Sequence, residues 1–161
     1  MKKKCRPVWL FFLPATAVML LIFVHSAMDA EQSLAESNWF TAIIDALFPG
    51  AFSAGQLTFF VRKAGHVTEY LLLGLTLLWG FVHFDVRNKA LLAWCIGTAY
   101  AVTDEIHQLF VPGRSCEFRD ICIDAAGVLA GVLIASAVLK AKRKNETLYM
   151  AEQMPFCMGK E

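Results

Sequence analysis

Long apolar stretches alternate with short polar segments along this chain. The first, Pro7–Met28, contains no Lys, Arg, Asp or Glu, so a helix there is long enough to cross a bilayer core of about 30 Å. Tyr70–Phe84, Ala90–Thr103 and Ala125–Leu139 are also free of these residues, but each provides only about 22 Å of helix. Their missing length must come from flanking turns that carry charge. The pattern predicts four transmembrane helices, at about residues 7–28, 62–84, 88–108 and 119–139.

A cleaved secretory signal peptide is the alternative interpretation of the first stretch, because Met1-Lys2-Lys3-Lys4 supplies a basic start. However, the apolar run is long for the core of a signal peptide. In addition, cleavage after Ala27 would place His25 where a small residue is preferred. A first transmembrane helix is the favoured interpretation.

An amphipathic segment lies between the first and second stretches. Its apolar residues recur at helical spacing: Trp39, Phe40, Ile43, Ile44, Leu47 and Phe48. Ser37 or Asn38 is positioned to cap the start of this helix, and Pro49-Gly50 is expected to end it. We predict an extracytoplasmic helix lying in the membrane interface, with Trp39 at the depth of the lipid headgroups. An incomplete fifth span is disfavoured by Asp45 and by the short length.

The composition supports a membrane environment. Hydrophobic residues make up 57% of the 161 residues and charged residues 18%, against about 45–50% and 25% in soluble domains. The mean hydropathy is +0.51. We predict an all-α, polytopic membrane protein: a four-transmembrane-helix bundle in residues 1–144 with a cytoplasmic tail in residues 145–161. The membrane lipid bilayer is therefore the expected partner, and the net charge of +1 gives no basic field for nucleic acid.

The five cysteines are odd in number and form no CxxC pair, so neither a disulfide framework nor a zinc site is predicted. Packing residues inside the apolar runs are the favoured interpretation.

Lys and Arg predict the orientation. Near the spans, ten lie before the first, between the second and third, or after the fourth, whereas Arg62, Lys63, Arg114 and Arg119 lie on the other side. The excess predicts that both termini are cytoplasmic. An even number of spans agrees with this.

Polar side chains gather at one end of the last three predicted spans. Antiparallel neighbours place the start of the second, the end of the third and the start of the fourth on the same, outer side. Helical spacing puts three groups of residues on shared faces: His66, Glu69 and Tyr70; Tyr100, Asp104, His107 and Gln108, with Glu105 about 100° away; and Asp120, Asp124, Gly127 and Gly131.

These faces predict a polar pocket that opens outward. Carboxylates within spans normally face the bundle interior or water, and they are functional candidates. Gly127 and Gly131 form a GxxxG pattern, which lets helix backbones approach closely. We interpret Arg62, Lys63, Glu117 and Arg119 as interface markers or as members of pairs that hold loops together.

Several segments resemble the VanZ-like family of small bacterial membrane proteins. They are RKAGHVTEYLLLG from Arg62, YAVTDEIHQLFVPGR from Tyr100, and the later Asp120, Asp124, Gly127 and Gly131. The resemblance spans about Pro7 to Leu139. It implies that the family's polar residues are Lys63, His66, Glu69, Asp104, Glu105, Gln108, Arg114, Asp120 and Asp124. Because the family is named after a protein associated with teicoplanin resistance, the resemblance also implies a role in the bacterial cell envelope.

Three functions are compatible with these residues. The first is a non-enzymatic pocket for a lipid-linked or wall-related ligand, with Arg114 binding an anionic head group. The second is an intramembrane enzyme acting on a phosphate-bearing lipid through acid–base or metal chemistry. Its candidate catalytic residues are Glu69, Asp104, Glu105 and His66, with His107 nearby. The third, ion movement, is disfavoured because the inner halves of the spans contain few polar residues. No cofactor or metal is assigned.

Overall fold

The computed structural model describes residues 8–49 and 52–157, and every regular element in this part of the chain is helical. A 3₁₀ helix, η1 (Val8–Phe12), leads into α1 (Leu13–Ser26). The remaining elements are α2 (Ala30–Leu47), α3 (Ala54–Val82), α4 (Lys89–Gln108) and α5 (Phe118–Cys157). Lys2, Lys3, Lys4, Cys5 and Arg6, on which part of the orientation prediction depends, lie outside the described residues.

Three of the described helices are long and apolar enough to cross a membrane. The qualifying stretches are Trp9–Ser26, Gly55–Val82 and Phe118–Met150. α4 is not among them, and Asp104, Glu105 and His107 near its end reduce its apolar length. The chain is thus an all-α membrane protein, and the fourth crossing, by residues 88–108, stays a prediction.

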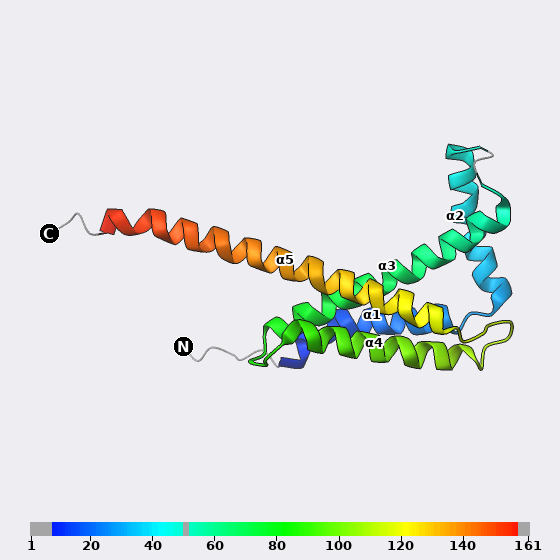
Figure 1. Cartoon of the computed structure of the whole chain (residues 1–161), viewed down its shortest axis with the longest axis horizontal. Coiled ribbons are helices and arrows are strands. Elements are labelled where there is room, and N and C mark those ends of the chain that lie inside the picture. The colour runs from blue at the N-terminus through cyan, green and yellow to red at the C-terminus, as the bar shows by residue number, and fades with distance from the viewer. Residues whose placement is uncertain (1–7, 50–51, 158–161) are drawn as a thin grey trace.

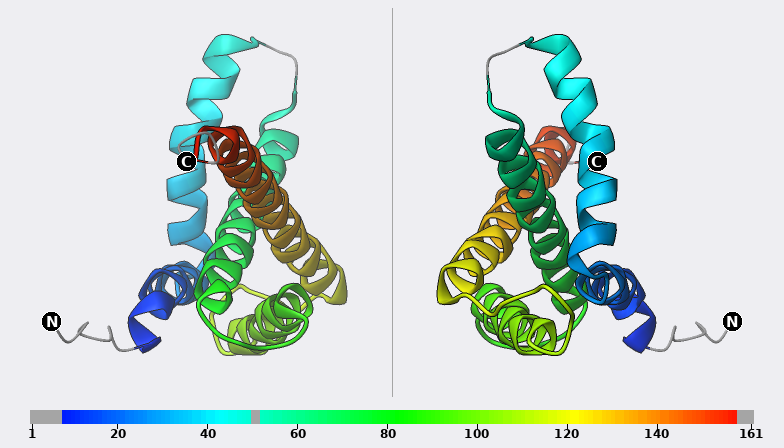
Figure 2. Two further views of the ribbon diagram at one scale, coloured as in Figure 1. Left: turned by 90° about the vertical axis from the view of Figure 1, so that its left-hand side faces the viewer. Right: turned by 90° about the vertical axis from the view of Figure 1, so that its right-hand side faces the viewer.

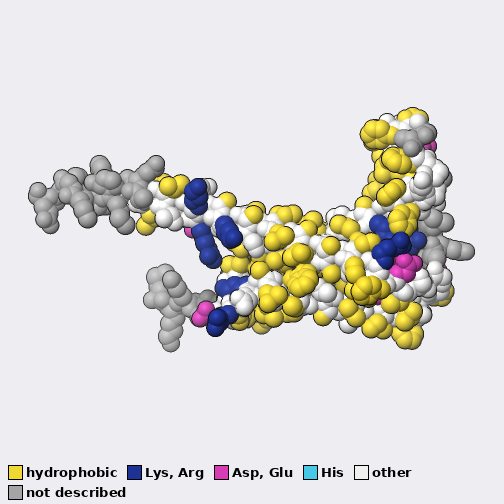
Figure 3. Space-filling view, viewed as in Figure 1, with side chains coloured by type: hydrophobic (Ala, Val, Ile, Leu, Met, Phe, Trp, Pro, Cys, Tyr) yellow, Lys and Arg dark blue, Asp and Glu magenta, His cyan; other side chains and the backbone are white. Residues whose placement is uncertain are grey.

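The helices form an elongated bundle from which α2 projects at one end (Figure 1). η1 and the C-terminal part of α5 lie toward the opposite end of the long axis. α3 packs against α1, α2, α4 and α5, and the views along the long axis show it between α1 and α5 (Figure 2). On the face that Figure 3 shows, hydrophobic side chains cover the middle of the bundle, whereas Lys and Arg gather toward its two ends.

Two helices extend beyond the predicted spans, and the predicted start of α2 was wrong. α3 begins at Ala54 rather than near residue 62, because Ser53 and Gln56 form a capping box that starts the helix earlier. α2 begins at Ala30, so Ser37 and Asn38 lie inside the helix and do not cap it. α5 continues beyond residue 139 to Cys157, through a segment with no Gly or Pro from 140 to 154. The end of α2 at Leu47, just before Pro49-Gly50, agrees with the prediction.

Glycines bring α3 and α5 into close contact, as the GxxxG pattern predicted. A Cβ atom added at Gly131 would overlap the backbone oxygen of Leu71, and one at Gly74 would overlap that of Val128. At Gly127 it would lie 3.0 Å from the backbone oxygen of Val67. This crossing places the first turns of α5 beside the middle of α3.

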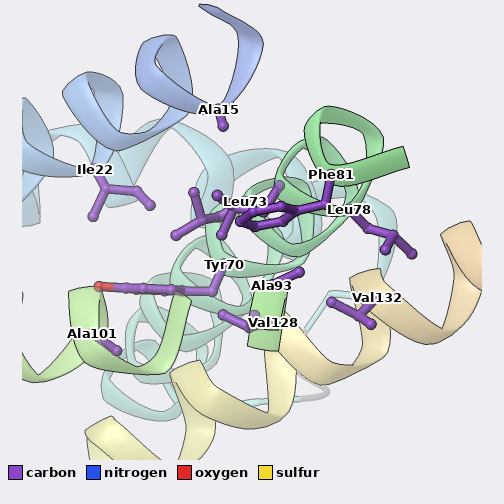
Figure 4. Packing of buried hydrophobic residues seen from close by; sticks show 11 residues of the cluster. Ala15, Ile22, Tyr70, Leu73, Leu78, Phe81, Ala93, Ala101, Val128 and Val132 are labelled. Atoms are coloured by element: carbon purple, nitrogen blue, oxygen red, sulfur yellow. The ribbon is translucent and has the colours of Figure 1, made fainter. Parts of the chain in front are cut away.

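Tyr70 occupies the centre of the buried core. It is fully buried and packs with Leu73 of α3, Ala101 of α4 and Val128 of α5 in one apolar cluster. Figure 4 shows its ring extending from α3 toward α4. The hydroxyl of Tyr70 therefore lies where the apolar core meets the polar residues.

Candidate functional site

Polar side chains from the middle of α3, the end of α4 and the start of α5 meet around Asp104, which is 4% exposed. The Tyr70 hydroxyl donates a hydrogen bond to Asp104 Oδ2 at 3.0 Å, and Gln108 Nε2 donates to the same oxygen at 3.5 Å. Asp104 and Gln108 were predicted to share one face of α4, and these bonds show that this face points into the bundle. One carboxylate oxygen of Asp104 is held by two neutral donors.

A second polar contact joins α3 to α5. Lys63 forms an ion pair with Asp120, and both side chains are largely buried. One turn further along each helix, His66 and Asp124 approach Asp104 of α4. Potential ligand atoms of His66, Asp104 and Asp124 all lie within 4.8 Å of one another. The structure thus brings together residues from all three predicted polar faces.

Two buried carboxylates have an oxygen without a hydrogen-bond partner among the described residues: Glu105 Oε1 and Asp124 Oδ2. Each residue is only 1% exposed. Glu105 is held through its other oxygen, which accepts a hydrogen bond from the backbone N–H of Glu117 at 3.0 Å. Leaving such atoms buried and unpaired is costly, so each needs a physical explanation.

A cavity of about 560 Å³ lies beside these groups. It is bounded by α1, α2, α3 and the loop between α4 and α5. Its polar lining includes His25, Arg62, His66, Glu69 and Arg114, and its apolar lining includes Leu21, Phe40, Ile44, Val61 and Leu72. His66 belongs both to this lining and to the group around Asp104. One ligand in this cavity could therefore contact two arginines, a carboxylate and an apolar wall.

Arg114 joins the loop after α4 to the end of α1. Its Nε donates to the backbone oxygen of Met28 at 3.2 Å, and its Nη2 donates to that of His25 at 3.3 Å. The preceding Gly113 has a φ of 73°, a conformation that glycine adopts without strain. Burial lowers the pKa of the Arg114 guanidinium, which remains a cation at neutral pH because its ordinary value is above 12. Arg114 thus places a fixed positive charge in the cavity wall.

The VanZ/LLP1 family model matches residues 11–140. The chain belongs to the VanZ-like family. Comparisons with curated proteins and with solved structures found no match to this chain. The matched range includes α1 to α4, the loop that carries Arg114 and the part of α5 that carries the two aspartates. The whole cavity and its neighbouring acids therefore lie within the VanZ-like part.

Two predicted site residues of this VanZ-like protein contact α1 and do not belong to the group of His66, Asp104 and Asp124. The side chain of Glu69 forms a hydrogen bond with the imidazole of His25 of α1. His107 also faces α1, where it lies 3.4 Å from Ser26 Oγ and packs against the Phe23 ring at 4.8 Å. Both residues connect the bundle to α1. His107 is therefore directed toward α1, whereas His66 is directed toward Asp104 and Asp124.

The contribution of α1 was missing from the predicted site. His25 and Ser26 are polar residues at the end of an otherwise apolar run, and that position was the available signal. Arg62, interpreted from the sequence as an interface marker, lies in the cavity wall. By contrast, Arg119 pairs with Glu117 at 3.0 Å on the exposed surface, as expected for a loop contact.

The cysteine prediction was wrong for the three whose side chains are described. Cys95, Cys116 and Cys122 are free and exposed rather than packed inside. In a membrane protein, residues that face lipid are as apolar as residues in the core. Hydropathy therefore does not show whether a cysteine in an apolar run is buried or exposed.

Proposed function

We propose that this VanZ-like protein binds a lipid-linked or wall-related ligand of the bacterial envelope in the cavity between α1, α2 and α3. The observation that carries the proposal is the pairing of Arg62 and Arg114 with an apolar wall in one cavity. An anionic head group would lie near the two guanidinium groups, which suit phosphate and carboxylate. An acyl or polyprenyl chain would lie against Leu21, Phe40 and Ile44.

The size of the cavity is consistent with such a ligand. A volume of about 560 Å³ falls within the range of about 300–1,000 Å³ typical of small-molecule sites. Most of the lining comes from α3, and α2 supplies the outer wall. A ligand with a long chain would extend from this cavity into the bilayer.

The proposed topology has four crossings, with both termini cytoplasmic and the cavity facing outward. The excess of Lys and Arg on the inner side supports it. In this arrangement α2 lies in the outer interface. Trp39, which is 65% exposed, and Phe40, which is 54% exposed, support that position.

The biological role that we propose is a contribution to glycopeptide resistance of the teicoplanin type. Binding a wall-related ligand at the outer membrane surface would change how the antibiotic reaches its target. Family membership supports an envelope role.

An intramembrane enzyme is the second candidate. The buried, unpartnered oxygens of Glu105 and Asp124 favour it, because acid–base catalysis uses carboxylates held in such surroundings. A phosphate-bearing lipid bound at Arg114 would be its substrate.

The first test is glycopeptide susceptibility of a deletion strain complemented with wild type, Arg114→Ala or Glu105→Gln. Arg143→Ala, an exposed arginine on α5, is the matched control. We expect wild type and Arg143→Ala to restore tolerance, and Arg114→Ala to fail at equal membrane abundance. Unchanged susceptibility in every strain would reject the resistance role.

A binding assay separates the two candidates. Purified protein in detergent is titrated with a polyprenyl monophosphate, and the uncharged polyprenol serves as the control lipid. We expect Arg114→Ala to weaken phosphate-dependent binding by about tenfold or more, the equivalent of one lost charge-assisted hydrogen-bonding group. If Glu105→Gln binds normally but does not restore tolerance, the enzyme is favoured. Equal binding of both lipids would contradict the head-group site.

A further inference from the structure

One imidazole and two carboxylates meet where α3, α4 and α5 converge. His66, Asp104 and Asp124 come from different helices, and each offers a ligand atom within 4.8 Å of the others. A metal ion about 2.0–2.2 Å from each atom requires separations of roughly 3.5 Å. Small side-chain rotations therefore suffice to close the group around an ion.

The burial of Asp124 independently points to a cation. The residue is 1% exposed, and its Oδ2 has no hydrogen-bond partner among the described residues. An isolated buried carboxylate is strongly destabilising unless it is neutralised, paired or bound to a metal. Lys63 is close but is engaged in an ion pair with Asp120. A divalent cation in the cluster would compensate the charges of both Asp104 and Asp124.

The surroundings of Asp104 fit the role of a metal ligand. Tyr70 and Gln108 both donate to its Oδ2, an arrangement that fixes the orientation of the carboxylate. Metal-binding carboxylates are commonly oriented by such outer hydrogen bonds. A purely structural acid would gain little from lying beside a second buried carboxylate.

We propose that His66, Asp104 and Asp124 bind one divalent transition-metal ion of the Zn²⁺ or Mn²⁺ class. Imidazole together with carboxylate oxygen suits these ions, and three protein ligands leave at least one position open. Because His66 also lines the cavity, a ligand bound there would have access to that position. The proposal does not depend on lipid binding at Arg114, although an ion here would attract a phosphate group.

The test uses the full-length protein, purified in detergent, with any affinity tag removed and bound metal stripped. Excess ZnCl₂ or MnCl₂ is added separately, unbound ion is removed, and metal is counted by mass spectrometry. We expect about one equivalent of one of the two ions per chain. Metal should also raise the melting temperature by several degrees, because an ion that binds only the folded state stabilises it.

Asp124→Asn and His66→Gln should weaken metal binding by about tenfold or more, since removing an outer-shell group alone costs about 10–100-fold. Asp45→Asn and His83→Gln, which change exposed residues outside the cluster, are the matched controls and should bind as wild type. Without metal, Asp124→Asn should melt no lower than wild type, because it removes an unpaired buried charge. This separates loss of a ligand from failure to fold.

Less than about a tenth of an equivalent of either ion in the wild type would overturn the proposal. Wild-type stoichiometry in both Asp124→Asn and His66→Gln would also overturn it, since the ion would then lie elsewhere. Arg114→Ala separates this proposal from the preceding one. It should retain its metal while losing the phosphate-bearing lipid, and either property can fail without the other.

Discussion

The hydroxyl of Tyr70 on α3 donates a buried hydrogen bond to Asp104 on α4 at 3.0 Å. Tyr70 is fully buried and Asp104 is 4% exposed. The tyrosine ring belongs to the apolar core, whereas the carboxylate belongs to the candidate site. Because the ring of Tyr70 is held by the core, this bond fixes the position of the Asp104 carboxylate.

Tyr70→Phe tests that bond. The substitution keeps the ring and removes the donor, so Asp104 loses one of its two side-chain donors. We expect a loss of about 1 kcal/mol in unfolding free energy, the usual size for such a bond in a bundle. The measurement is the melting temperature in detergent. Tyr149→Phe, an exposed tyrosine on α5, should leave the melting temperature unchanged, and an equal effect of both substitutions would contradict a specific role for Tyr70.

Gly131→Leu tests the close crossing of α3 and α5. Even one added carbon at Gly131 would overlap the backbone of Leu71, so the helices must separate. We expect destabilisation by about 1–3 kcal/mol or more from overpacking, together with reduced membrane abundance. Ala126→Leu, at an exposed position on the same helix, is the control. Wild-type stability of Gly131→Leu would show that the two helices do not pack through this glycine.

Cys116 tests the proposed orientation, because it is free, exposed and located in the loop between α4 and α5. If that loop lies outside, a membrane-impermeant maleimide should label the protein in intact cells. Cys116→Ser should abolish most of this labelling. The tail cysteine Cys157 should become reactive only after the cells are made permeable. Labelling that requires permeable cells in both proteins would reverse the proposed topology.

The sequence was sufficient to predict an all-α membrane protein and the polar helix faces whose residues lie together in the candidate site. Long uncharged stretches are strong signals because charged groups are costly in lipid. Helical periodicity then placed Asp104 with Gln108, and Asp120 with Asp124 and the two glycines. These relationships are local, since residues three and four positions apart share a helix face.

Hydropathy and helical periodicity predicted the ends of the helices less well. Hydropathy locates apolar stretches, but helices continue wherever propensity and capping allow, as in α3 from Ala54 and α5 to Cys157. A helix that crosses a membrane is not required to end at its surface.

Only the tertiary structure determines which polar side chains contact one another. The sequence placed His66 and His107 on comparable faces, but the packing directs His66 toward Asp104 and Asp124 and His107 toward α1. It also brings His25 to Glu69 and the backbone carbonyls of His25 and Met28 to Arg114. The sequence determines which face of each helix is polar, through a repeat of about 3.6 residues. The relative rotation and crossing of the helices depend on contacts between residues distant in the chain, such as Gly131 with Leu71, and no local pattern encodes them.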